Sequence, residues 1–183
     1  MPKQILIYGV PGAGKTTAGT LVESQLQLPL ISGDYLREVA QGEHTKEEAP
    51  FAYYGTCQAW ANFGELNKEH AVIGLKAVRD AMRPYVSKVI TFQTGYIFEV
   101  AFLDPNDYRS KATLCLVTTR SKEKHREQFF RNRKVTEETT SEFMAARLVQ
   151  EYLINEAQQN HILIIDNVAT EQVLSQNLSI SFR

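Results

Sequence analysis

The feature that most constrains this chain is an eight-residue segment close to its start. The segment reads Gly9-Val10-Pro11-Gly12-Ala13-Gly14-Lys15-Thr16 and matches the pattern G-x-x-x-x-G-K-[ST]. Glycines in such a loop let backbone N–H groups turn inward around phosphate oxygens, and the helix that follows adds the positive end of its dipole. We expect this loop, extended by Thr17, to bind ATP. Lys15 would act on the β- and γ-phosphates as a catalytic residue, and the Thr16 hydroxyl would bind Mg²⁺.

Apolar runs and segments of helical period alternate along the rest of the chain. We expect strands over 4–9, 28–32, 88–92, 112–118 and 161–166. Helices are expected from 15, from 34, and over 67–85, 121–133, 139–159 and 170–176. This alternation predicts an α/β protein with a parallel sheet between two layers of helices and with ligands bound beyond the carboxyl ends of the strands. No linker or repeat interrupts the pattern, so a single domain over 1–183 is expected.

Composition argues against several classes of function. The net charge is −1, which is unlike a dedicated nucleic-acid or anionic-membrane binder. The apolar run Ile5–Tyr8 is too short for a signal sequence or a membrane span, so a cytoplasmic protein with a small-molecule partner is expected, as a monomer or homodimer. The two cysteines, Cys57 and Cys115, lie far apart in apolar surroundings and are interpreted as reduced core thiols.

The segment that follows the second expected strand narrows the reaction. Leu28-Pro29-Leu30-Ile31-Ser32-Gly33-Asp34-Tyr35-Leu36-Arg37 resembles the corresponding segment of adenylate kinases and related small P-loop kinases. In those kinases the aspartate caps a helix whose arginine, one turn on, binds the phosphate of the acceptor. The resemblance implies that Asp34 and Arg37 bind the acceptor and that Asp34 is catalytic. It also implies a five-stranded sheet of the nucleoside monophosphate kinase type, with a helical acceptor insert over about 34–86.

The C-terminal half looks most like the bacterial and archaeal 2-phosphoglycerate kinases. The likeness rests on the segments Thr118–Arg133, Ala146-Arg147-Leu148-Val149-Gln150-Glu151-Tyr152-Leu153 and Ile164-Ile165-Asp166-Asn167. It implies a P-loop fold with a lid-like segment over about 120–142, and arginines that neutralise the charge of the transferring phosphoryl group. The candidates are Arg126, Arg131, Arg133 and Arg147. The alternative is that 120–134 is a solvated basic helix face.

Two further features have competing interpretations. His125 is a conceivable base, but its spacing of four residues from Phe129 favours packing or a structural hydrogen bond. An aromatic run between the acceptor helix and the long helix could stack on an acceptor base, although the core of a small helical insert is the favoured interpretation. That run consists of Phe51, Tyr53, Tyr54, Trp60 and Phe63.

One departure from the kinase pattern concerns catalysis. The strand beside the P-loop strand commonly ends in an acidic residue that handles magnesium, whereas the expected third strand, 88–92, continues as Gln93-Thr94-Gly95. Asp34 would have to supply the missing charge, or Glu99 if the chain bends back. Three classes of function therefore remain: an ATP-dependent kinase of a small phosphorylated or hydroxylated metabolite, a nucleoside monophosphate kinase, and an ATP-binding regulatory protein without phosphoryl transfer.

Overall fold

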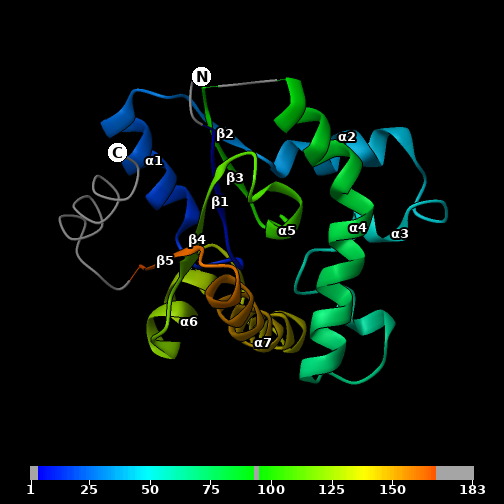
Figure 1. The fold of residues 1–183 in the computed structure, drawn as a ribbon. Coiled ribbons are helices and arrows are strands. Elements are labelled where there is room, and N and C mark those ends of the chain that lie inside the picture. Colours follow the sequence, from blue (N-terminus) through cyan, green and yellow to red (C-terminus); the bar gives the residue numbers. More distant parts are fainter. Residues whose placement is uncertain (1–3, 93–94, 168–183) are drawn as a thin grey trace.

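Five parallel strands form the centre of the molecule (Figure 1). The structure is a computed structural model and describes residues 4–92 and 95–167. Every neighbouring pair of strands in the order β2-β3-β1-β4-β5 is parallel, which confirms the predicted α/β class and the five-stranded sheet. The strands are β1 (Ile5–Tyr8), β2 (Leu30–Ser32), β3 (Ile97–Val100), β4 (Thr113–Thr118) and β5 (Leu163–Asp166).

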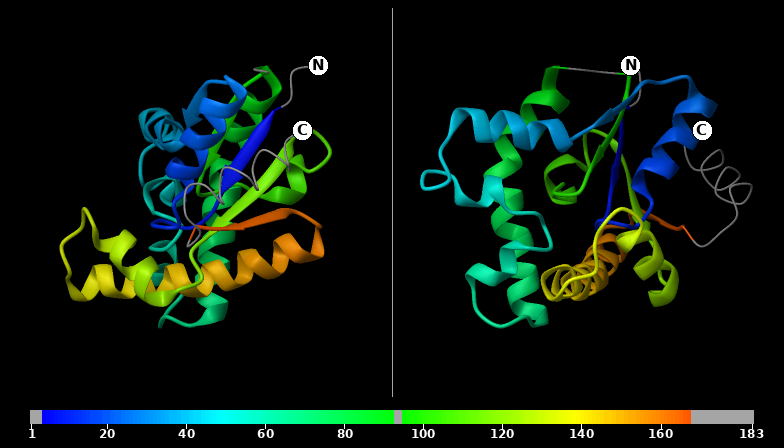
Figure 2. Two further views of the ribbon diagram at one scale, coloured as in Figure 1. Left: turned by 90° about the vertical axis from the view of Figure 1, so that its left-hand side faces the viewer. Right: turned by 180° about the vertical axis from the view of Figure 1, so that it is seen from behind.

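Helices cover both faces of the sheet (Figure 2). They are α1 (Lys15–Leu26), α2 (Asp34–Glu43), α3 (Pro50–Tyr53), the 3₁₀ helix η1 (Ala59–Asn62), α4 (Lys68–Phe92), α5 (Pro105–Tyr108), α6 (Lys122–Phe130) and α7 (Glu137–Gln159). Among the described residues, no helix is both long and apolar enough to cross a membrane. The helix expected over 170–176 lies outside the described residues.

The alternation of side chains along β1 divides the core in two. Ile5 and Ile7 pack in a smaller cluster with the apolar face of α1, whereas Leu6 and Tyr8 belong to a larger cluster with α4 and α7. All four side chains are buried, as expected of a strand in the middle of a parallel sheet. Cys57 and Cys115 are free and buried, one in each cluster, as the sequence predicted.

The expected strand over 88–92 is wrong, because these residues form the last turns of α4. The helix predicted to end at 85 continues through Pro84 to Phe92. Val78, Met82, Val86 and Ile90 are all buried and follow one another at intervals of four, so one apolar stripe extends the helix into the core. The strand beside β1 is β3, which begins only at Ile97.

A buried ion pair fastens α4 to α7 against the sheet. Both terminal nitrogens of Arg79 donate to the Glu156 carboxylate, at 2.9 and 2.8 Å, and the Tyr152 hydroxyl donates to the same carboxylate at 2.9 Å. Arg79 is 2% exposed. Because each buried charge depends on the other, the pair fixes the register between these two long helices.

Candidate active site

The glycine-rich loop joins β1 to α1 and has the backbone geometry of a phosphate cradle. Gly12 and Gly14 have φ values of 77° and 88°, in the left-handed region that favours glycine. A Cβ atom on Gly12 would lie 2.9 Å from the Phe129 Cα, and one on Gly14 would collide with the Asn167 side chain. The loop is therefore walled by α6 on one side and by the end of β5 on the other.

The N-terminus of α1 is open to an anion. No side chain caps this helix, and its first turn holds no acidic residue. The free N–H groups and the helix dipole therefore point at the space enclosed by the loop. This geometry agrees with the prediction that residues 9–17 bind phosphate groups.

Lys15 lies across the loop. Its Nζ donates to the Val10 carbonyl at 3.2 Å. Burial lowers the pKa of Lys15, and the nearby carboxylates of Glu99 and Asp34 oppose that shift. Both carboxylates favour the charged form of the Lys15 ammonium group, as a bound phosphate would.

Glu99, one of the two acids expected to supply the missing charge, lies on β3, the strand beside β1. Its Oε1 accepts a hydrogen bond from the Thr16 hydroxyl at 2.9 Å, and its backbone pairs with Ile7 of β1. Glu99 is 7% exposed. Within 4–92 and 95–167 it makes no ion pair with lysine or arginine. The expectation of a missing acid at Thr94 is wrong because it depended on the misplaced strand, and Thr94 itself lies outside the described residues.

The pair of Thr16 and Glu99 fits a magnesium ion. Magnesium prefers oxygen ligands and is usually held by one or two protein groups together with substrate phosphates and water. A hydroxyl and a carboxylate lie side by side at the mouth of the phosphate cradle. A largely buried carboxylate is stabilised further by a bound cation. Asp34, exposed at the start of α2, is the second carboxylate whose charge acts on Lys15.

Arg37 makes contacts within the acceptor insert. Its guanidinium donates to the backbone carbonyls of Ala52, at 3.1 Å, and Tyr54, and it stacks over the Phe102 ring at 5.3 Å. Burial lowers its pKa, and Asp34 opposes that shift. The side chain thus ties α2 to the segment after α3, and its predicted role at an acceptor phosphate stays a prediction.

Two of the other candidate arginines are also engaged with the protein. Arg126 stacks on Phe130 at 4.9 Å, and Arg147 donates to the carbonyls of Thr119 and Arg120 at 2.8 and 3.0 Å. Arg131 is exposed at the C-terminal end of α6.

Arg133 has the clearest link to the phosphate loop, since its charge lowers the pKa of Lys15. It stacks on Phe129 at 4.3 Å and donates to the Phe129 carbonyl at 2.7 Å. No sequence pattern distinguishes this arginine from its neighbours, because nothing local indicates which side chain of the segment faces the loop.

His125 supports the loop from behind. It is fully buried, its Nε2 lies 2.9 Å from the Pro11 carbonyl, and its ring packs edge-on against Phe129 and Phe143. Since that carbonyl can only accept, Nε2 carries the proton, and Nδ1, 3.5 Å from the Arg147 guanidinium, is the acceptor. Burial lowers the pKa of His125. The favoured interpretation of a packed, hydrogen-bonded histidine is confirmed.

A family model described as an AAA domain matches residues 8–52. The 2-phosphoglycerate kinase of Methanococcus vannielii is 24% identical over 197 residues, which cover 96% of this chain and 63% of that protein. The enzyme of the same name from Pyrococcus furiosus is 26% identical over 189 residues, which cover 96% of this chain and 62% of that protein. The chain thus spans less than two thirds of these relatives.

Solved structures share the fold. Shikimate kinase from Acinetobacter baumannii, in complex with shikimate, superimposes with a TM-score of 0.60 at 15% identity and covers 98% of this chain and 92% of its own. Deoxyadenosine kinase from M. mycoides, with bound dATP, gives a TM-score of 0.54 at 13% identity and covers 98% of each chain. The chain therefore has the fold of the small P-loop kinases, and the resemblance to 2-phosphoglycerate kinases predicted from its sequence is confirmed.

Proposed function

We propose that this chain is an ATP-dependent phosphotransferase that acts on a small metabolite, with Mg²⁺ as the metal. The observation that carries the proposal is the hydrogen bond between Thr16 and Glu99, which places a hydroxyl and a carboxylate beside Lys15 at the mouth of the phosphate loop. An acid at this position can bring magnesium to the transferring phosphate. The regulatory alternative depended on its absence and loses that basis.

The proposed reaction is an in-line transfer. A hydroxyl oxygen of the acceptor attacks the γ-phosphorus, the bond from that phosphorus to the β–γ bridging oxygen breaks, and ADP leaves with the bond's electron pair. The loop N–H groups and Lys15 hold the phosphates, and Asp34 orients the acceptor hydroxyl and receives its proton. When bound between the phosphates and Thr16, with Glu99 beside it, magnesium offsets the charge of the β- and γ-oxygens.

The lid-like segment would complete the charge balance. Arg133, whose charge acts on Lys15, is the first candidate to bind a phosphate oxygen when the segment after α6 moves. Arg126, Arg131 and Arg147 stay candidates for the same role. Closure would also exclude water, which otherwise competes with the acceptor.

Two measurements test the proposal. Calorimetric titration with ATP and Mg²⁺ is expected to show one site. Lys15→Met is expected to reduce the affinity for ATP at least about tenfold, because it loses a charged hydrogen bond. A coupled ADP assay with glycerates, sugars and nucleoside monophosphates is expected to find acceptor-dependent turnover. Equal ATP affinity in both proteins, or only slow ATP hydrolysis with every acceptor, would contradict the proposal.

A further inference from the structure

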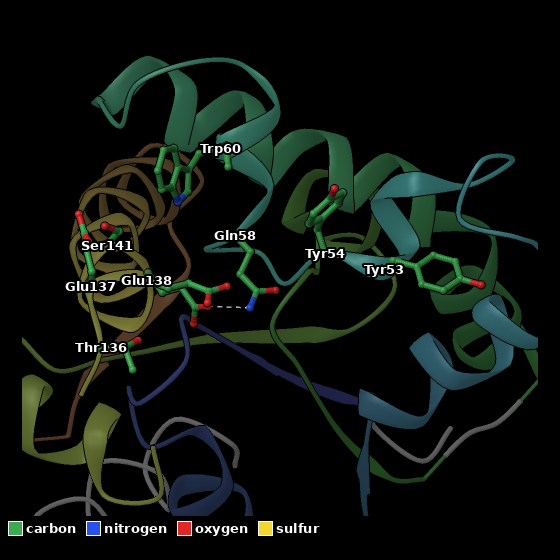
Figure 3. Close-up of a pocket in the computed structure, with 10 residues that line it drawn as sticks. Tyr53, Tyr54, Gln58, Trp60, Thr136, Glu137, Glu138 and Ser141 are labelled. Atoms are coloured by element: carbon green, nitrogen blue, oxygen red, sulfur yellow. Dashed lines mark hydrogen bonds between the residues drawn. The ribbon is translucent and has the colours of Figure 1, made fainter. Parts of the chain in front are cut away.

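A cavity of about 760 Å³ lies between the acceptor insert and the beginning of α7 (Figure 3). One wall comes from the chain between α3 and η1, and the other from the first turns of α7. Its ten lining residues are Tyr53, Tyr54, Gln58, Trp60, Ala61, Thr136, Glu137, Glu138, Ser141 and Glu142. The aromatic run noted in the sequence supplies Tyr53, Tyr54 and Trp60 to one wall, but the sequence did not indicate the other wall, which is more than 70 residues away in the chain.

The aromatic part of the lining is held in place by hydrogen bonds. The Trp60 indole N–H donates to the Cys57 carbonyl at 3.1 Å, so one ring edge is fixed and its face is left for packing. The Tyr53 hydroxyl is directed away from the cavity, towards the carbonyls of Gln41 and His44, as Figure 3 shows for its side chain. Trp60 and Tyr54 are therefore the rings best placed to contact a ligand.

The polar part of the lining is acidic. Glu137, Glu138 and Glu142 contribute three carboxyl groups, and none of the lining residues is lysine, arginine or histidine. Glu142 accepts a hydrogen bond from the Gln58 amide at 2.7 Å, which joins the two walls (Figure 3). Glu137 and Glu138 lie in the first turn of α7, where the helix dipole stabilises negative charge.

The cavity lies within electrostatic reach of the phosphate loop. Cys57, the neighbour of Gln58, is buried, and burial raises the pKa of its thiol to about 12. The charges of Lys15 and Arg133 lower that pKa and the charge of Glu142 raises it. His125 also joins the two places, since its Nε2 lies 2.9 Å from the Pro11 carbonyl of the loop and its ring packs on Phe143, the neighbour of Glu142, at 5.2 Å. A ligand in the cavity can therefore direct one group towards the γ-phosphate while its remainder contacts the aromatic rings.

The charges and aromatic rings that line the cavity determine which ligands it can bind. Phosphate and carboxylate groups need arginine, lysine or free N–H groups, whereas here they would face three carboxyl groups. Two basic residues contact this wall from outside the lining: Arg37 donates to the Tyr54 and Ala52 carbonyls, and the Lys46 ammonium group lies 5.2 Å from the centre of the Tyr54 ring. Hydroxyl groups, in contrast, donate to carboxylates, apolar C–H faces pack on aromatic rings, and ammonium groups are attracted to both.

We propose that this cavity is the acceptor site and that the acceptor is a polyhydroxylated molecule without phosphate or carboxylate groups, either an uncharged polyol or an amino polyol. The inference rests on the proposed kinase function and specifies its substrate class. It separates this chain from the relatives named 2-phosphoglycerate kinase, since 2-phosphoglycerate carries both kinds of anionic group.

Intrinsic fluorescence tests the proposal directly, because Trp60 is the single tryptophan of the chain. The protein with Mg²⁺ and a non-hydrolysable ATP analogue is titrated with glucose, myo-inositol and glucosamine, and separately with 2- and 3-phosphoglycerate. A saturable change is expected with at least one of the first three. The affinity for that ligand is expected to fall about fivefold in Glu138→Gln, because a charged hydrogen-bond acceptor becomes neutral. It is expected to stay unchanged in Glu151→Gln, an exposed position of the same helix. A change with phosphoglycerates alone, or none with the polyols, overturns the proposal.

Ionic quenchers test the charge of the cavity without any choice of ligand. Relative to free N-acetyltryptophanamide, caesium is expected to quench Trp60 more efficiently than iodide does. Glu138→Gln is expected to reduce that preference, and Glu151→Gln is expected to leave it unchanged. Equal relative quenching by the two ions overturns the acidic character on which the proposal depends.

Failure of this inference is distinguishable from failure of the proposed function. If 2-phosphoglycerate is phosphorylated and Trp60→Phe and Glu138→Gln do not alter its KM, the kinase stands and the acceptor class is wrong. If Mg·ATP does not bind, the kinase proposal is wrong, and the polyol titration of the protein alone still shows whether the cavity binds such a ligand.

Discussion

Replacement of Glu99 by glutamine is the sharpest perturbation of the phosphate site. Glutamine has nearly the same shape as glutamate and keeps a side-chain oxygen that accepts the hydrogen bond from Thr16. In the wild type the Thr16 hydroxyl lies 2.9 Å from the Glu99 carboxylate oxygen. The fold is therefore expected to tolerate the change. What is lost is one negative charge, at a position that is 7% exposed and beside the hydroxyl that would bind magnesium.

The size of the effect follows from that environment. Two unit charges about 4 Å apart interact by about 4 kcal/mol at the effective dielectric constant of a protein surface, and desolvation of the carboxylate offsets part of this. Loss of a group that supports a bound metal commonly costs about 10- to 100-fold in metal affinity. We expect the ratio of ATP affinities with and without Mg²⁺ to fall by about that factor in Glu99→Gln.

The assay is calorimetric titration of ATP in Mg²⁺ and in EDTA, repeated with Asp34→Asn as the control. Asp34 also acts on Lys15 but does not contact Thr16, so its variant is expected to keep the magnesium dependence. An unchanged magnesium dependence in Glu99→Gln would refute the assignment of this acid, and a loss confined to Asp34→Asn would transfer the role to Asp34.

Three further predictions concern the walls of the loop and the core. Gly14→Ala is expected to abolish ATP binding, because its Cβ would collide with Asn167 and its φ is 88°, and calorimetry with ATP checks this. Burial lowers the pKa of His125 in the folded protein. The contribution of this residue to the free energy of unfolding is therefore complete above the ordinary histidine pKa of 6.5 and is lost as the pH falls below 6.5. Chemical unfolding between pH 5 and 8 is expected to show this loss in the wild type and a smaller loss in His125→Gln. Glu156→Gln leaves the buried Arg79 with only Asp104, 3.9 Å from one of its terminal nitrogens, as a charged partner and is expected to cost up to about 3–5 kcal/mol of the free energy of unfolding, measured with urea.

Each of these predictions has a control. Gly42→Ala introduces a side chain where nothing lies within 4 Å and is expected to leave ATP binding intact. His44→Gln removes an exposed histidine and is expected to keep the pH slope. Tyr152→Phe removes one hydrogen bond to Glu156 and keeps the ion pair, so a loss near 1 kcal/mol is expected. Equal effects in variant and control would contradict the corresponding argument.

Local sequence patterns predicted most of the fold, and the error at β3 shows where they fail. The run Lys88–Phe92 is rich in β-branched residues, which favours a strand, yet its apolar residues continue the spacing of the preceding helix. Packing of α4 on the core overrides the local preference. The true strand, Ile97–Val100, contains a glutamate in a buried position, a pattern that looks unfavourable until its partner is known.

The candidate site also contains parts that the sequence predicted and parts that it did not. The phosphate loop was predictable because its chemistry is contained in eight consecutive residues. Glu99 meets Thr16 only through the pairing of β3 with β1, and the aromatic cavity needs α7 to fold back over the insert. Long-range contacts of this kind leave little trace in one sequence. His125 was the exception, because its spacing from Phe129 indicated the packing that the structure confirms.

A crystal structure with magnesium and a non-hydrolysable ATP analogue would test the central claim most directly. The account predicts phosphates inside the loop of Gly9–Thr16, a metal on the Thr16 hydroxyl, and Glu99 bound to that metal directly or through one of its water ligands. Phosphates outside the loop would contradict the account, as would a metal held by Asp34 while Glu99 kept only its hydrogen bond to Thr16.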